Sequence, residues 1–160
     1  MSLFNFETKY WLLILEDGKL TIIDESFCDL VPEKSLISYT KNPGVIVLKS
    51  FGKFWGLAGL RFGCAIGLPK TLQALKDTLG PWAASGPALF IANSALSDRR
   101  WITNNRARLN KDVLNLDKIL LKNDIKVIGG TSLFRLISIK DPKKLQDKLC
   151  QRKILTRTFP

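Results

Sequence analysis

The most informative part of this chain is residues 50–63, which read Ser-Phe-Gly-Lys-Phe-Trp-Gly-Leu-Ala-Gly-Leu-Arg-Phe-Gly. The apolar run Val45-Ile46-Val47-Leu48 leads into this stretch and predicts a buried strand. The chain then turns through four glycines, and glycine at this density allows positive φ angles and the close approach of a flat ligand. The turn presents one hydroxyl, one amine and one guanidinium, from Ser50, Lys53 and Arg61.

These three polar groups suit one kind of chemistry. An amine among Gly, Phe and Trp is expected to lose hydration, which favours its neutral, nucleophilic form. A hydroxyl before it and an arginine after it can hold a phosphate. A carbonyl-reactive lysine together with phosphate-binding side chains is the minimum needed to bind pyridoxal phosphate (PLP) as a Schiff base. The alternative interpretation is a surface turn with a solvated lysine.

Length and composition limit the remaining possibilities. The 160 residues are enough for one domain of ordinary size, and 46% hydrophobic residues suffice for a packed core. No apolar run has the length of a membrane span, and the N-terminus is a poor signal peptide, so we expect a cytoplasmic protein. The absence of histidine excludes Ser-His and Cys-His catalysis and any His-ligated metal within this chain. Three widely spaced cysteines predict buried, reduced thiols and no metal site.

The formal charge of +11 raises the possibility of a nucleic-acid or acidic-membrane partner. The basic residues are, however, spread over two amphipathic segments near residues 99–111 and 140–148. Such faces are usually solvated, and no interleaving of basic and aromatic residues indicates base stacking. We therefore expect no nucleic-acid partner and no membrane partner, and a basic binding module is kept only as an alternative.

The pattern of apolar residues predicts alternating strands and helices, that is, an α/β fold. Trp82, in a Gly-Pro loop, is expected to lie either in the core or on the wall of an active site. Asp141 and Pro142 are expected to start the last helix. The predicted elements are a short helix within residues 1–16; buried strands at 20–23, 45–49 and 61–67; helices at 70–79 and 88–121, the latter with room for a bend; antiparallel strands at 125–128 and 133–139; a helix at 141–150; and a strand at 154–157.

Residues 50–63 resemble the lysine motif of the class I/II aminotransferases, which are fold type I PLP enzymes. A second motif of that family, Asp-Glu-Ser-Phe at residues 24–27, precedes it at the expected distance. The resemblance implies that Lys53 is the catalytic lysine, that Asp24 pairs with the PLP ring nitrogen, and that Ser50 and Arg61 hold the phosphate. It also implies a large domain with a mostly parallel sheet, here residues 1–95, and a small C-terminal α+β domain, here residues 96–160.

Phe27 is where this sequence departs from many family members, which carry a tyrosine that can hydrogen-bond the cofactor's ring oxygen. Phenylalanine at this place resembles the threonine-phosphate decarboxylase branch, which serves cobalamin biosynthesis. The function that this resemblance implies is decarboxylation of an amino-acid phosphate. The alternatives are a histidinol-phosphate-type aminotransferase and a non-catalytic remnant.

Members of the family are much longer than this chain. The resemblance therefore implies a fragment, without the glycine-rich phosphate loop of the family's N-terminal half. It also implies a small-molecule amino-acid substrate, and either a homodimer or complementation by the missing half.

Overall fold

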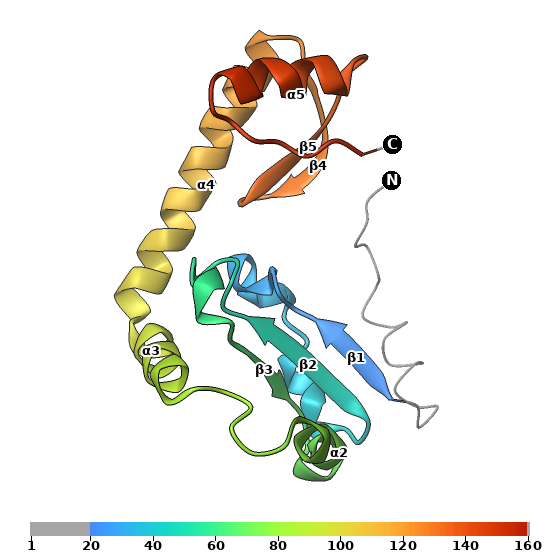
Figure 1. The fold of residues 1–160 in the computed structure, drawn as a ribbon, viewed down its shortest axis with the longest axis vertical. Coiled ribbons are helices and arrows are strands. Elements are labelled where there is room, and N and C mark those ends of the chain that lie inside the picture. The colour runs from blue at the N-terminus through green and yellow to red at the C-terminus, as the bar shows by residue number, and fades with distance from the viewer. Residues whose placement is uncertain (1–19, 160) are drawn as a thin grey trace. The chain divides into compact units, whose positions relative to one another are not determined.

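The computed structural model describes residues 20–159 (Figure 1). The helix predicted within residues 1–16 lies outside the described residues. Contacts divide the chain into two compact units, Met1–Asn104 and Asn105–Pro160. Each unit combines strands with helices, so the predicted α/β class is confirmed.

The first unit contains a three-stranded sheet in the order β1-β2-β3 (Figure 1). Its strands are β1 (Thr21–Asp24), β2 (Val45–Ser50) and β3 (Gly63–Ile66). β1 and β2 are parallel, with Asp24 opposite Leu48, whereas β2 and β3 are antiparallel, with Ser50 opposite Gly63. The carboxyl ends of β1 and β2 therefore meet the start of β3 at one edge of the sheet.

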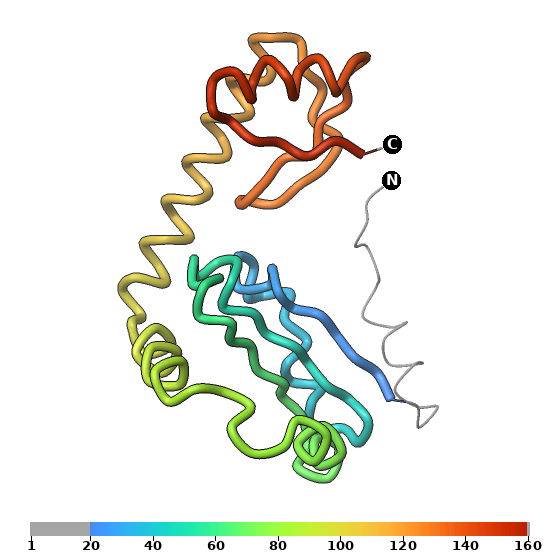
Figure 2. The backbone as a smooth tube through the Cα atoms, viewed as in Figure 1, coloured from blue at the N-terminus to red at the C-terminus, as the bar shows by residue number. Residues whose placement is uncertain are grey.

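The connection between the parallel strands runs through three short 3-10 helices, which are η1 (Cys28–Leu30), η2 (Pro32–Lys34) and η3 (Ile37–Lys41). Figure 2 shows this segment leaving the end of β1 and returning to the start of β2, in blue to cyan. Leu36 and Tyr39 from this connection pack against the buried cluster of Ile23, Val45 and Val47. The connection thus covers one face of the sheet.

The strand predicted at residues 20–23 forms, as β1, but the prediction that it is buried is correct for only one of its faces. Thr21 and Ile23 are buried, but Leu20 is 62% exposed and Ile22 is 57% exposed. Successive side chains of a strand point to opposite faces. The described residues therefore cover only one face of β1.

Helix α2 spans Pro69–Leu79. The single long helix predicted for residues 88–121 is instead two helices, α3 (Gly86–Ser97) and α4 (Arg99–Lys122). Asp98 separates them, and its side chain accepts a hydrogen bond of 2.8 Å from the N–H of Trp101. An aspartate in this place caps the first turn of a new helix, which explains the break. Trp82 is 93% exposed, so its placement in the core is wrong.

The second unit holds the antiparallel hairpin of β4 (Lys126–Thr131) and β5 (Phe134–Ser138), followed by α5 (Pro142–Gln151). The predicted pairing of these strands is confirmed, and Asp141 caps α5 by accepting from the N–H of Lys144 at 2.9 Å. The strand predicted at residues 154–157 is wrong, because no strand forms there. The carbonyl of Thr156 accepts from the side chain of Gln146 at 2.6 Å instead.

A buried carboxylate fixes the start of the connection after β1. Glu25 is 4% exposed, and its oxygens accept from Lys49 Nζ at 2.9 Å, the Ser35 hydroxyl at 2.8 Å and the Leu36 N–H at 2.6 Å. Burial alone would raise the pKa of Glu25. The hydrogen bonds from Lys49, Leu36 and Ser35 outweigh burial and hold this pKa below its usual value. The ionised form is therefore the one that the fold stabilises.

We predict that Glu25→Gln flattens the dependence of stability on acid pH. The pKa of Glu25 is lower in the folded chain than the ordinary value of 4.5, so its contribution is present above pH 4.5 and is lost as the pH falls through the folded pKa. At neutral pH, Glu25→Gln should lower the free energy of unfolding by about 1–3 kcal/mol. Urea unfolding at a series of pH values measures both effects. The exposed Glu33→Gln is the matched control, and parallel curves for wild type and Glu25→Gln would contradict the prediction.

We also predict that Gly130→Ala destabilises the β4–β5 hairpin whereas Gly129→Ala does not. Gly130 has φ of +142°, and an added Cβ would lie 2.3 Å from the carbonyl oxygen of Phe134. Gly129 has open space around the same position. Unfavourable backbone geometry costs on the order of 1–3 kcal/mol even before the clash is counted. Denaturant unfolding of the two variants, compared with wild type, measures the difference, and equal stabilities would show that the prediction is wrong.

Candidate active site

Two of the predicted site residues end the parallel strands of the sheet. Asp24 is the last residue of β1, and Ser50 is the last residue of β2. Ligands of open α/β sheets bind beyond the carboxyl ends of the strands. The topology thus brings both predicted motifs to the edge of the sheet where such chemistry is found.

Lys53 lies beside the segment that follows β1. Its Nζ is 5.6 Å from the centroid of the Phe27 ring, which is the distance of a cation–π contact. The two sequence motifs, far apart along the chain, are therefore neighbours in space. Phe27 is 38% exposed, so the contact lies at the surface of the described chain.

The prediction that the amine of Lys53 is dehydrated by its neighbours is wrong for the described chain, because Lys53 is exposed. The aromatic neighbours point into the protein: Phe54 is 2% exposed and Trp55 is 8% exposed. Trp55 stacks on Phe51 and Trp101, with ring centroids 5.5 and 5.7 Å apart. The aromatic side chains therefore occupy the buried side of the turn and leave the lysine on its outer side.

Ser50 and Arg61 line one hollow of about 250 Å³, together with Gly52, Ala58, Phe62 and Gly63. The Ser50 hydroxyl oxygen accepts from the Gly52 N–H at 3.2 Å. Arg61 has a left-handed backbone with φ of +51°, and its guanidinium donates to the Ala58 carbonyl at 3.3 Å. A hydroxyl and a guanidinium around one small hollow form a donor set that suits a phosphate.

The carboxylate of Asp24 makes its hydrogen bonds within its own turn. It accepts from the N–H of Ser26 at 2.8 Å and from the Ser26 hydroxyl. The structure therefore brings Lys53 to Phe27 and Ser50 to Arg61, and it places Asp24 at the same edge of the sheet with an exposed side chain.

Sequence reasoning missed the pair of charged side chains, Lys49 and Asp29, that contacts the turn carrying Lys53. The carboxylate of Asp29 accepts from Lys49 Nζ at 3.0 Å through one oxygen, and from the indole N–H of Trp55 at 3.0 Å through the other. Hydrogen bonds to Glu25 and Asp29 raise the pKa of Lys49, against the lowering effect of its burial. One signal could have pointed to this group: Lys49 directly follows the apolar run of residues 45–48 within β2, and a charge in that setting needs a carboxylate partner.

Cys28 is not a nucleophile in this arrangement. Burial, with a further contribution from the charge of Glu25, raises the pKa of Cys28 to about 11, so its thiol stays protonated at neutral pH. All three cysteines are free. Cys28 and Cys64 are half-buried and Cys150 is exposed, so the prediction that they are buried is wrong.

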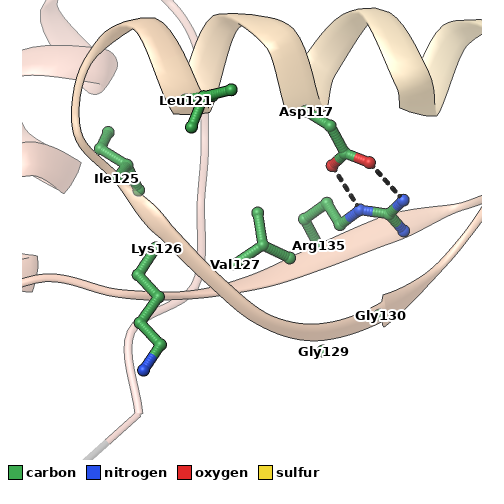
Figure 3. A pocket seen from close by; sticks show the side chains of 8 residues that line it. All are labelled: Asp117, Leu121, Ile125, Lys126, Val127, Gly129, Gly130 and Arg135. Carbon is green, nitrogen blue, oxygen red and sulfur yellow. Dashed lines mark hydrogen bonds and ion pairs between the residues drawn. The ribbon is translucent and has the colours of Figure 1, made fainter.

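A second hollow, of about 610 Å³, lies in the second unit between α4 and the hairpin (Figure 3). Arg135 on its wall donates to both carboxylate oxygens of Asp117, at 2.6 and 2.8 Å, and to the Thr131 carbonyl at 2.7 Å. This pairing holds the pKa of Asp117 below its usual value. The guanidinium is committed to linking β5 with α4, and Lys126 is the other cation among the lining residues. It is lined by Asp117, Leu121, Ile125, Lys126, Val127, Gly129, Gly130 and Arg135.

Residues 20–159 contain no group of three or more Cys, Asp or Glu side chains that could hold a metal ion. Within the same residues, no helix has the length and apolar character needed to cross a membrane.

Comparison with known proteins shows which family this chain matches. The family described as aminotransferase class I and II matches residues 10–159. The chain is 43% identical over 144 residues to a threonine-phosphate decarboxylase from Pseudomonas aeruginosa. The matched region covers 89% of this chain and 43% of that protein. It is 29% identical over 145 residues to a histidinol-phosphate aminotransferase from Syntrophotalea carbinolica, with 89% of this chain and 42% of that protein covered.

A solved structure shares the fold. The histidinol-phosphate aminotransferase from Sinorhizobium meliloti, solved in complex with pyridoxal 5'-phosphate, superposes with a TM-score of 0.76 at 23% identity, covering 87% of this chain and 40% of that one. The chain thus spans less than half the length of the relatives that it matches. Because the family match extends over nearly all of its residues, the chain belongs to the class I and II aminotransferase family.

Proposed function

We propose that this chain supplies the lysine-bearing part of a PLP-dependent active site that acts on an amino-acid phosphate, as in the threonine-phosphate decarboxylases. The observation that carries this proposal is the meeting of the two motifs at one sheet edge, where Lys53 Nζ lies 5.6 Å from the Phe27 ring. The similarity to a decarboxylase of that name supports the same conclusion.

The residues present fit the phosphate of PLP. The hollow between Ser50 and Arg61 offers a hydroxyl and a guanidinium on one wall. Gly52 shapes this wall, because a Cβ there would lie 3.6 Å from Ser50 Oγ and 3.4 Å from Ala58 Cα. A side chain larger than that of alanine at Gly52 would therefore crowd the space in which Ser50 presents its hydroxyl.

Each predicted residue then has a distinct task. PLP, when bound, supplies the electron sink for the carbanion that forms at the substrate Cα. Lys53 would hold the cofactor through its side-chain nitrogen. Once that nitrogen is released from the cofactor, the amine would deliver a proton to the substrate Cα. The carboxylate of Asp24 would keep the ring nitrogen protonated, and Phe27 would pack beside Lys53 without contributing a hydroxyl.

Decarboxylation is favoured over transamination by two observations. Identity is 43% to the decarboxylase and 29% to the aminotransferase. Phe27 also lacks the hydroxyl with which a tyrosine would hydrogen-bond the cofactor. A histidinol-phosphate-type aminotransferase is the second candidate, and the overlap with such enzymes over most of this chain favours it.

The rest of the proposal concerns the setting of the site. We assign residues 1–95 to the large cofactor-binding domain and residues 96–160 to the small domain. The chain covers 43% of its decarboxylase relative, so further polypeptide is needed to complete the site. We expect either a homodimer or complementation by the missing half, in the cytoplasm, with a small-molecule substrate and with neither a nucleic-acid nor a membrane partner.

We predict that PLP attaches to Lys53 and to no other lysine. Borohydride reduction of the chain after incubation with PLP should leave a pyridoxyl group on Lys53, located by mass spectrometry of peptides. Lys53→Ala should remove the label, whereas the exposed Lys70→Ala should retain it. Arg61→Ala should weaken PLP binding by about tenfold or more, because a charge-assisted hydrogen bond is lost.

The same preparation discriminates among the candidate functions. A chain that takes up no PLP in a saturable manner, even when it is supplied with the remainder of the enzyme, would be a non-catalytic remnant, and the proposal would fail. When the chain is supplied with the remainder of the enzyme, release of carbon dioxide from threonine phosphate supports decarboxylation. Amino transfer from histidinol phosphate without carbon dioxide would support the second candidate instead.

A further inference from the structure

The turn that carries Lys53, here called the lysine turn (residues 51–57), is closed by its own backbone. The N–H of Leu57 donates to the Phe51 carbonyl at 2.9 Å, and the N–H of Gly56 donates to the Lys53 carbonyl at 3.1 Å. A turn closed in this way moves as one piece. The position of the Lys53 amine therefore depends on what holds the whole turn in place.

Aromatic packing restrains the lysine turn in one direction. Trp55 stacks on Phe51 and on Trp101 with nearly parallel rings, at interplanar angles of 21° and 12°. Stacked rings tolerate offset with little change in energy. The ring of Phe54, with its centroid 5.2 Å away at 84°, packs against the same indole. Apolar contacts therefore hold the rings of Trp55 and leave its N–H as the directional contact of this side chain.

Asp29 supplies the directional restraint. One oxygen accepts from the Trp55 indole N–H at 3.0 Å, inside the lysine turn, and the other accepts from Lys49 Nζ at 3.0 Å, just before the turn. The Asp29 side chain is only 15% exposed, and the indole is buried. Hydrogen bonds weaken steeply when they are bent or stretched. The contact with Trp55 therefore ties the turn to Asp29, and the contact with Lys49 ties Asp29 to the end of β2.

The place of Asp29 in the chain links this restraint to the site. Asp29 lies in η1, two residues after Phe27, whose ring faces the Lys53 amine. We propose that Asp29 is a positioning residue, which sets the distance between the Lys53 amine and the segment that carries Asp24 and Phe27. The importance of this distance for catalysis rests on the proposed function, but the restraint itself does not.

Two variants test the restraint from opposite ends. Asp29→Asn removes the charge that faces Lys49, and Trp55→Phe removes the indole N–H while keeping a ring for stacking. Glu33→Gln, an exposed carboxylate in the same connection, is the matched control for charge. Asp29→Glu, which keeps the carboxylate, is the conservative variant for rescue.

Two measurements on the full chain without PLP report the outcome. Competitive acetylation compares the reactivity of Lys53 with that of the exposed Lys41 and Lys70. Hydrogen exchange follows the amides of Gly56 and Leu57 against those of β2. We expect Asp29→Asn and Trp55→Phe each to speed exchange at the two turn amides by about tenfold. We also expect Lys53 acetylation to rise, no further increase in the double variant, and wild-type behaviour in Glu33→Gln and Asp29→Glu.

Two results would overturn the proposal. The first is unchanged Lys53 acetylation and unchanged turn exchange in both single variants. The second is equal acceleration at the turn amides and in β2, which would give Asp29 only a general role in stability. If Asp29→Asn does not fold, Trp55→Phe decides the question alone. PLP uptake is measured separately, on the chain supplied with the remainder of the enzyme, so its absence contradicts the proposed function and leaves this test intact.

Discussion

The ammonium of Lys49 between two carboxylates is the contact on which the described site depends. Lys49 Nζ lies 2.9 Å from Glu25 and 3.0 Å from Asp29, all three side chains being largely buried. Removing the Lys49 ammonium would leave two largely buried carboxylates without a cation, and breaking a buried pair in this way typically costs about 3–5 kcal/mol. The connection after β1 is therefore joined electrostatically to the end of β2. These ion pairs also bring the two sequence motifs together. Asp24 and Phe27 lie in the segment that carries the carboxylates, and Ser50 and Lys53 follow Lys49.

Strand periodicity explains how one short segment serves both structure and ligand. Neighbouring side chains of a strand point to opposite faces. Lys49 enters the charged group, and Ser50, the next residue, lines the hollow that it shares with Arg61. A shift of β2 by one residue would exchange these directions and place the hydroxyl in the charged group. The register Asp24 to Leu48, which the parallel pairing of β1 and β2 sets, is therefore a condition for the site.

The parts of this molecule that could be predicted from sequence are those that local patterns determine. The strand before Ser50, the β4–β5 hairpin and the Asp141 cap follow from apolar runs and turn residues within a few positions. The exposure of Lys53 and Ile22 could not be predicted, since it depends on which side of a turn or strand the rest of the fold covers. The Asp29 contacts join residues 20 and 26 positions apart, and no local pattern carries such pairings.

The exposure of the predicted site residues has a consequence for how binding energy arises. Lys53, Asp24 and Arg61 are all exposed in the described chain, where water screens charges and weakens their attraction for an anion. The same groups act far more strongly when a binding partner or ligand excludes water from them. The chain covers less than half of its relatives' length, so we expect the remaining polypeptide to supply this cover. On this view the chain contributes the polar groups, and the strength of their proposed interaction with a cofactor comes from the surface that closes over them.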